Sequence, residues 1–248
     1  MTAILSRACD TLPKADEEAI KIEEINYDNL IILDACRYDL YQQVTGKKDY
    51  RISTGSSSRN VVKRNFSEGD WSDTVMITAN PHFSDRLFEE ITGRESDQVF
   101  HTVFKLFNTE WSEEEGTVLP RDMVDTALTA EKLFPGKKKI IWFMQPHCPF
   151  IPLESEELDN IEGLDSEENI WDKAERGKIG DEMLWTAYLN NLKYVMKEVD
   201  ELIDKLEGRS VITSDHGNLV GESGLYGHPL GQETKVLRKV PFDVRDQN

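Results

Sequence analysis

Two side chains of the kinds that bind metal ions stand together near the C-terminus. The β-branched run 211–213 is followed closely by Asp215, His216 and Gly217. Open α/β sheets place their sites at the carboxyl ends of their strands, so this pair is expected at such an edge. A carboxylate beside an imidazole suits a divalent ion such as zinc or manganese. The alternative is a helix cap or a turn, where Asp and Gly are also common.

Polar residues follow other apolar runs in the same way. The largely apolar run 29–33 ends at Asp34, and the run 139–144 stops shortly before His147. The carboxyl ends of parallel strands lie along one edge of a sheet. We therefore expect these side chains to meet Asp215 in space.

A hydroxyl-rich turn at residues 54–58 lies between a predicted strand and a predicted helix. An ion held by Asp34, Asp215 and His216 would lower the pKa of a neighbouring hydroxyl. The N-terminus of the following helix would also favour negative charge there. The resulting alkoxide could attack a phosphorus or sulfur centre.

Two further histidines, His147 and His228, also follow predicted strands. They could hold a second ion or donate hydrogen bonds to the non-bridging oxygens of a substrate, because two ions about 4 Å apart can steady an in-line displacement. The sequence therefore predicts one or two divalent ions. The remaining histidines, His82 and His101, have no motif around them and are expected to be surface or core residues.

The elements that must position these residues alternate along the chain. Apolar runs predict strands at residues 29–33, 50–53, 74–79, 98–104, 139–144, 210–213 and 239–244. The last of these strands is expected at an edge of the sheet. The longest predicted helix covers residues 181–207, with apolar residues at three- and four-residue steps before Gly208. The alternation predicts an α/β fold, with a mostly parallel sheet and helices on both faces.

The length of 248 residues favours one compact domain, residues 1–248. Within it, residues 1–27 are predicted to be an N-terminal extension. Residues 153–177 are acidic and contain few large apolar side chains, so they are predicted to form an insertion, either a solvated loop or a lid.

The charge balance limits the possible partners. The chain has 29 basic and 47 acidic residues, a net charge of −18, so nucleic acid is not expected as a partner. The acidity indicates either an ordinary solvated surface or a protein of a high-salt cytoplasm. No membrane span is expected, because no run of about 18 apolar residues occurs. Three cysteines and an N-terminus unlike a secretory signal favour a cytoplasmic location, and no oligomeric state is indicated.

Four motifs, taken in order, resemble the sulfatase-like branch of the alkaline phosphatase and sulfatase superfamily, which includes phosphoethanolamine and phosphoglycerol transferases. Residues 34–39 (DACRYD) are similar to the branch's D-x-x-R-x-D, and the hydroxyl turn 54–58 stands where the branch carries its nucleophile. Residues 147–150 (HCPF) resemble H-x-P-F. Residues 214–229 (SDHGNLVGESGLYGHP) resemble S-D-H-G-E-x-x-G-E-x-G-x-Y. The resemblance implies an alkaline phosphatase-like fold.

The resemblance also implies roles for the metal-type residues. Asp34, Asp215 and His216 match the ligands of the principal metal. His147 and His228 match positions that contact substrate oxygens or bind a second zinc. His228 stands where many sulfatases carry lysine.

The nucleophile is assigned by the branch's spacing within the hydroxyl turn. Ser56 fits best, Ser58 second and Thr54 third. Arg59, which follows the turn, is expected to contact an anionic substrate. The formylglycine motif of sulfatases would require a cysteine or serine at position 55, which is Gly55. An unmodified serine favours phosphate over sulfate esters.

These residues together predict a metal-dependent hydrolase of phosphate mono- or diesters that acts on a small anionic ester. If an alcohol rather than water clears the phospho-enzyme, the same site is a phosphoryl-group transferase. Two alternatives remain: a sulfate ester hydrolase, and a catalytically inactive binding protein with the same fold.

Overall fold

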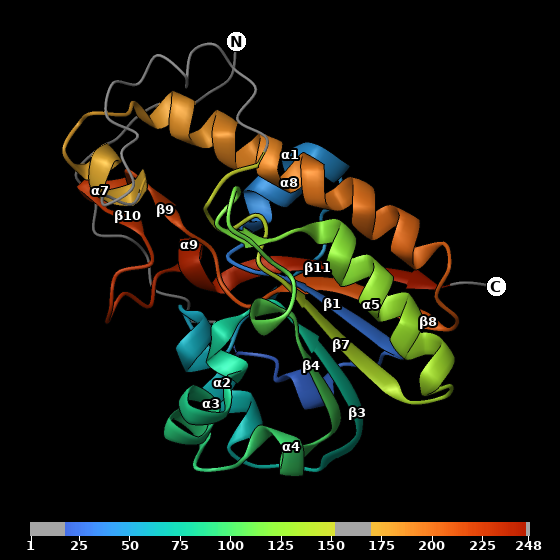
Figure 1. Ribbon diagram of the computed structural model, residues 1–248. Helices are drawn as coiled ribbons and strands as arrows, with labels where there is room; N and C mark the ends of the chain where they lie inside the picture. Colours follow the sequence, from blue (N-terminus) through green and yellow to red (C-terminus); the bar gives the residue numbers. More distant parts are fainter. Residues whose placement is uncertain (1–17, 152–169, 247–248) are drawn as a thin grey trace.

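The computed structural model describes residues 18–151 and 170–246. A seven-stranded sheet forms its centre, with helices on both faces (Figure 1). In spatial order the strands are β2 (Tyr50–Ile52), β11 (Lys239–Asp246), β8 (Arg209–Ser214), β1 (Asn29–Leu33), β7 (Lys138–Phe143), β3 (Trp71–Thr78) and β4 (Phe100–Lys105). The strands from β8 to β4 pair in parallel, and β11 is antiparallel to both of its neighbours. The predicted mostly parallel α/β sheet is therefore confirmed.

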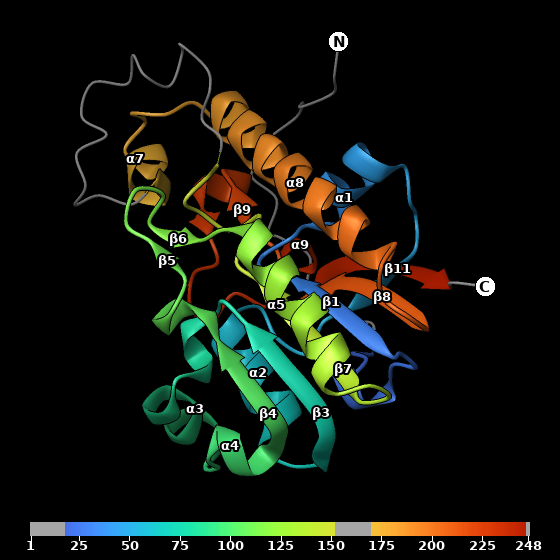
Figure 2. The same ribbon diagram turned by 45° about the vertical axis from the view of Figure 1, so that its right-hand side comes forward.

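Each face of the sheet is covered by its own set of helices (Figures 1 and 2). One face packs against α1 (Tyr38–Thr45), α5 (Pro120–Leu133) and α8 (Asp181–Ile203). The other packs against α2 (Ser58–Phe66), α3 (Asp85–Thr92) and α4 (Ser96–Val99). The shorter elements are η1 (Ile22–Glu24), η2 (Pro81–Phe83), η3 (Leu106–Asn108), β5 (Trp111–Ser112), β6 (Thr117–Val118), α7 (Ile170–Glu175), β9 (Leu219–Val220), η4 (Glu222–Gly224), β10 (Tyr226–Gly227) and α9 (Lys235–Arg238).

The apolar runs form central strands because both faces of the sheet are buried. In β1, Ile31 and Leu33 join the cluster under α1, α5 and α8, whereas Leu30 and Ile32 join the cluster under α2 and α3. All five residues of β1 are buried. Continuous apolar sequence is the expected signature of such a strand.

Two predicted elements differ from the structure. The strand predicted at the sheet edge, β11, is not an edge strand, because it pairs with β8 on one side and with β2 on the other. The three-residue β2 forms that edge instead. The long helix, α8, ends at Ile203 rather than at residue 207, and Gly208 adopts a positive φ of 80° just before β8.

The predicted extension and insertion are only partly described. Residues 22–24 of the extension form η1, and residues 170–175 of the insertion form α7. Residues 1–17 and 152–169 lie outside the described residues. None of the helices within 18–151 and 170–246 is long and apolar enough to cross a membrane.

Candidate metal centre and its serine

The sheet register brings the two predicted carboxylate ligands together. Leu33 of β1 pairs with Ser214 of β8, so Asp34 and Asp215 follow at the ends of adjacent parallel strands. Ala35 then turns the chain with a positive φ of 57°, which is unusual for a residue with a side chain. The backbone N–H of Ala35 donates to Asp215 Oδ1 at 2.9 Å. The other carboxylate oxygen, Oδ2, lies 3.4 Å from His216 Nε2.

His216 completes a three-residue cluster. Its Nδ1–H donates to the Gly217 carbonyl at 2.8 Å, so Nε2 is the ring nitrogen that faces the carboxylates. His216 Nε2 lies 3.4 Å from Asp215 Oδ2 and 3.8 Å from Asp34 Oδ1. One donor atom from each residue lies within 4.8 Å of the other two, and all three residues are buried.

The electrostatics of this cluster fit a cation. Burial, and then the neighbouring charge of Asp215, raise the pKa of Asp34 to about 6. Two buried carboxylates side by side are costly unless a positive charge or hydrogen bonds offset them. Two carboxylate oxygens and one imidazole nitrogen are a donor set that zinc and manganese both accept. The residues present therefore fit the predicted divalent ion.

A hydroxyl group lies against this cluster. Ser58 Oγ donates to Asp215 Oδ2 at 2.7 Å and lies 3.3 Å from Asp34 Oδ2 and 3.2 Å from His216 Nε2. Ser58 is the first residue of α2, and the preceding Ser57 caps that helix. The hydroxyl is therefore at a helix N-terminus, where negative charge is stabilised.

The other residues of the hydroxyl turn are placed differently. Ser56, the position favoured by the branch's spacing, is buried but makes no hydrogen bond to the cluster among the described residues. Thr54 Oγ1 accepts a hydrogen bond of 2.8 Å from Asn65 Nδ2 within α2. Of the three candidates, the structure brings Ser58 to the metal-type residues.

His147 and His228 lie beside the cluster. The ring of His228 is 4.5 Å from the ring of His216, and the ring of His147 is 5.7 Å from that of His228, measured between centroids. Burial, and then the neighbouring His216 and His147, lower the pKa of His228 to about 3, so its imidazole is neutral near pH 7. Neither histidine belongs to the cluster of three found among the described residues.

Arg59 lies away from the cluster. Its side chain is 48% exposed, and its guanidinium pairs with Glu90 of α3 at 2.8 Å. The expected contact between Arg59 and an anionic substrate stays a prediction.

Asn80 and His82, which sequence reasoning left outside the site, join it through Asp34. Asn80 Nδ2 donates to Asp34 Oδ2 at 2.7 Å, and Trp142 Nε1 approaches the same oxygen at 3.3 Å. Asn80 Oδ1 accepts from the backbone N–H of His82 at 2.9 Å and from its Nδ1–H at 2.8 Å. The available signal was the sequence Asn-Pro-His shortly after β3, a strand-then-polar pattern like the one that marked Asp34.

Other motif residues hold the turns in place. Arg37 of the first motif pairs with Asp39 at 2.6 Å and with Glu222 of the fourth motif at 2.7 Å. A Cβ atom at Gly217 would lie 2.7 Å from the backbone oxygen of Val236, so this position requires glycine. These contacts explain the arginine, aspartate, glycine and glutamate of the motifs. The four residues hold the turns in shape and take no direct part in chemistry.

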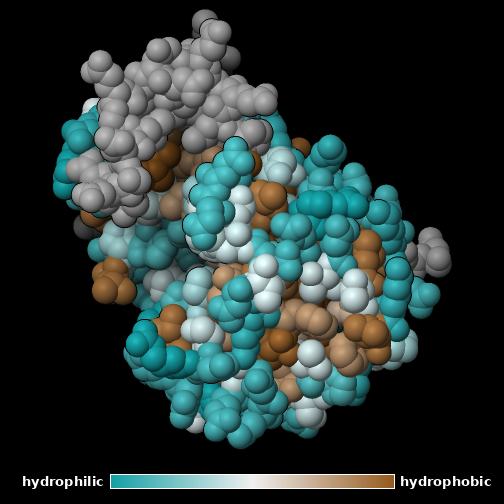
Figure 3. All heavy atoms as spheres, viewed as in Figure 1, coloured by the Kyte–Doolittle hydropathy of each residue, from teal (hydrophilic) through white to brown (hydrophobic). Residues whose placement is uncertain are grey.

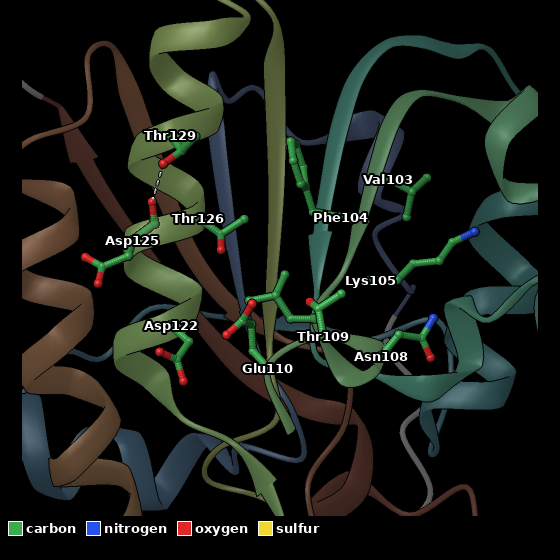
Figure 4. Close-up of a pocket in the computed structure, with 11 residues that line it drawn as sticks. Val103, Phe104, Lys105, Asn108, Thr109, Glu110, Asp122, Asp125, Thr126 and Thr129 are labelled. Carbon is green, nitrogen blue, oxygen red and sulfur yellow. Dashed lines mark hydrogen bonds between the residues drawn. The ribbon is translucent and has the colours of Figure 1, made fainter. Parts of the chain in front are cut away.

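A separate hollow of about 680 Å³ lies between α5 and the edge strand β4 (Figure 4). Asp122 and Asp125 of α5 line one side, and Phe104 and Lys105 of β4 line the other (Figure 4). None of the predicted site residues lines it.

Comparisons with known proteins identify the fold. A scan against protein-family models and a search of curated proteins find no match. Among solved structures, an integral membrane lipooligosaccharide phosphoethanolamine transferase A from Neisseria meningitidis superposes with a TM-score of 0.56 at 15% identity. The C-terminal periplasmic domain of EcEptC from Escherichia coli, in complex with zinc, superposes with a TM-score of 0.53 at 12% identity. A protein of the alkaline phosphatase superfamily from Vibrio parahaemolyticus gives 0.50 at 13% identity.

These likenesses extend over most of this chain. They cover 86%, 94% and 96% of it, respectively. The chain spans 47% of the Neisseria protein, 76% of the Escherichia domain and 62% of the Vibrio protein. The motifs of the sequence predict the same fold. This chain has the fold that these phosphoethanolamine transferases share with the alkaline phosphatase superfamily protein.

Proposed function

We propose that this protein is a metal-dependent phosphate ester hydrolase in which Ser58 is the nucleophile. The observation that carries the proposal is the contact of Ser58 Oγ with Asp34, Asp215 and His216 at the N-terminus of α2. Ser58 replaces Ser56 as the preferred nucleophile because only Ser58 makes these contacts among the described candidates.

Asp34 Oδ1, Asp215 Oδ2 and His216 Nε2 would hold the ion, since hydrogen bonds within the fold leave these three atoms facing one another. Zinc and manganese are the proposed ions. When bound, the ion would act as a Lewis acid and lower the pKa of the neighbouring hydroxyl.

Ser58 Oγ would attack the phosphorus atom of an ester. A bond forms between Oγ and phosphorus, and the bond from phosphorus to the leaving oxygen breaks with its electron pair. Without the ion, the Ser58 hydroxyl donates to Asp215 Oδ2 at 2.7 Å; with that oxygen bound to the ion, the serine proton would pass to the leaving oxygen, which departs as an alcohol. Water would then hydrolyse the phosphoserine, which returns the free hydroxyl and releases phosphate or a phosphate monoester.

The neighbouring imidazoles would orient the substrate. The ring of His228 lies against that of His216, the backbone N–H of His147 donates to the Asp34 carbonyl at 3.1 Å, and His82 contacts Asn80, which donates to Asp34. The Nδ1–H groups of His147 and His82 already donate to the Cys148 carbonyl and to Asn80 Oδ1, so these rings would donate an Nε2–H to a non-bridging phosphate oxygen only when protonated. The proposed substrate is therefore a small anionic ester held beside these histidines.

Phosphoryl transfer to an alcohol is a second candidate reaction. It is favoured by the superposed structure of a phosphoethanolamine transferase, which shares the fold over 86% of this chain. The same Ser58 chemistry serves both reactions, and only the group that clears the phosphoserine differs.

The test is a matched pair of serine variants. Metal-stripped protein would be reloaded with zinc or manganese and assayed with para-nitrophenyl phosphate, bis-para-nitrophenyl phosphate and para-nitrophenyl sulfate. Ser58→Ala should lower turnover by about 10³-fold or more, whereas Ser56→Ala should retain it within about 10-fold. The reverse order would reject Ser58 as nucleophile. Metal-loaded protein without turnover on any ester would favour the inactive binding protein.

A further inference from the structure

A buried arginine on the edge strand reaches the metal-binding turn. Arg51 of β2 is 2% exposed, although its charge would ordinarily keep it at the surface. Its Nε donates to Thr213 Oγ1 at 2.8 Å, its Nη1 to the Ile20 carbonyl at 3.1 Å and its Nη2 to the Ser214 carbonyl at 2.8 Å. All three acceptors are uncharged.

The side chain of Arg51 reaches across two strand-to-strand spacings of the sheet. The backbone of Arg51 pairs with Val240 of β11, and β11 lies between β2 and β8. The guanidinium therefore passes β11 to reach the last two residues of β8. Strands are about 4.8 Å apart, so the side chain must be extended to make these contacts.

Ser53 makes the adjacent contact. It lies two residues after Arg51 on the same face of the extended segment, and its Oγ donates to the carbonyl of Asp215. Arg51 and Ser53 thus hold two consecutive carbonyls, those of Ser214 and Asp215. From the other side, the backbone N–H of Ala35 holds the Asp215 carboxylate.

The positive charge of Arg51 interacts with the Asp215 carboxylate of the site, although the two groups form no direct ion pair. No carboxylate lies within ion-pair distance of its guanidinium in the described parts of the chain. Burial lowers the pKa of Arg51 to about 10, and the negative charge of Asp215 acts against that shift. The guanidinium therefore stays charged near pH 7, behind a cluster with two buried carboxylates.

We propose that Arg51 is a positioning residue for the metal centre: with Ser53, it fixes the two peptides on either side of Asp215 so that the Asp215 carboxylate is presented to the ion. This inference rests on the metal site of the proposed function. Groups that orient metal ligands commonly contribute about 10- to 100-fold to metal affinity, so the loss of these hydrogen bonds should be measurable.

The experiment measures the dissociation constant for zinc and manganese by titration of metal-stripped protein. Arg51→Lys keeps the charge and loses the fork of donors. Ser53→Ala removes the second hydrogen bond with a smaller structural change, in case the arginine variant fails to fold. Arg94→Lys is the control, because Arg94 also donates to two backbone carbonyls, those of Phe66 and Gly69, at a turn between α2 and β3.

Arg51→Lys and Ser53→Ala should each weaken metal binding by about 10-fold, with Arg94→Lys within 2-fold of wild type. Unfolding of the metal-free proteins, measured in parallel, separates this effect from general destabilisation, since Arg94→Lys should lose stability without losing metal affinity. Wild-type affinity in both Arg51→Lys and Ser53→Ala would overturn the inference alone. No binding by wild type would overturn the proposed metal site and this inference together.

Discussion

The ionisation of one residue, Asp34, links the stability of the protein to its site. Its carboxylate is buried beside Asp215, and its pKa is raised to about 6 from 3.8. A folded-state pKa above the unfolded value means that the folded protein binds the proton more tightly. The metal-free protein is therefore stabilised by this group at low pH, and it loses that contribution as the pH rises from about 4 to about 6.

Replacing Asp34 with Asn should stabilise the metal-free protein at neutral pH. The pKa difference corresponds to about 3 kcal/mol, since each unit is worth about 1.4 kcal/mol. Urea unfolding in the presence of a chelator should show Asp34→Asn as the more stable form at pH 8, with the advantage shrinking as the pH falls to 5.5. An equally or less stable variant at pH 8 would show that the carboxylate pair is not strained without a cation.

Asn80 should contribute to metal affinity although it is not a ligand. Asn80→Ala removes a 2.7 Å hydrogen bond to Asp34 Oδ2 and releases the His82 ring from Asn80 Oδ1. Metal titration should show binding weaker by about 10-fold. Asn108→Ala is a suitable control, because Asn108 is an exposed residue of η3 outside the cluster. Equal effects of the two substitutions would remove Asn80 from the site.

At the scale of elements, the site depends on the turns that follow β1 and β8. The turn after β8 has no space at Gly217, where a Cβ atom would lie 2.7 Å from the Val236 backbone oxygen and 3.0 Å from Arg37 Cγ. A backbone atom cannot move away as a flexible side chain can. The position of His216 therefore depends on the absence of a side chain at the next residue.

Gly217→Ala should destabilise the protein by about 1 to 3 kcal/mol and weaken metal binding. Gly180→Ala is the matched control, because Gly180, with φ −75°, has no atom within 4 Å of a Cβ at that position. The control should remain within about 1 kcal/mol of wild type. Denaturant unfolding and metal titration of both variants would check this. A Gly217→Ala protein as stable as the control would mean that the turn can adjust.

The strand ends could be predicted from the sequence because central parallel strands are continuous apolar runs. This placed Asp34, Asp215 and His216 at one edge, where the structure also has them. Ser56 and Ser58 could not be separated in the same way, since their positions depend on where α2 begins. The cap at Ser57 sets that start and directs Ser58 at the carboxylates.

Other features depended on tertiary pairing that a single sequence does not contain. The strand at residues 239–244 is predicted at an edge, and only its pairing with the three-residue β2 makes β11 internal. Arg51 lies in that same short strand and gave no local signal of a role. Its importance follows from its reach past β11 to Ser214.

At the scale of the whole molecule, the net charge of −18 sets how stability depends on salt. Hydrophilic residues cover much of the face shown in Figure 3. Like charges spread over such a surface repel one another and destabilise the compact state. Salt screens this repulsion, since the Debye length falls from about 10 Å at 0.1 M to about 3 Å at 1 M.

The melting temperature should therefore rise as potassium chloride is increased from 0.1 M to 1 M. Each kcal/mol gained would raise it by about 2 to 4 °C for a chain of this size. Thermal unfolding at constant pH, with a chelator present, would measure the effect apart from metal binding. A melting temperature that falls or stays constant would argue against a protein adapted to high salt. The cytoplasmic location stays a prediction.

The most direct test of the central claim is a calorimetric titration of metal-stripped protein with zinc and with manganese, for wild type and Asp215→Asn. Wild type should bind at least one ion per chain. Asp215→Asn, which loses a buried carboxylate ligand but no volume, should bind at least about 100-fold more weakly. No binding by wild type, or equal binding by the two proteins, would contradict a metal centre formed by Asp34, Asp215 and His216.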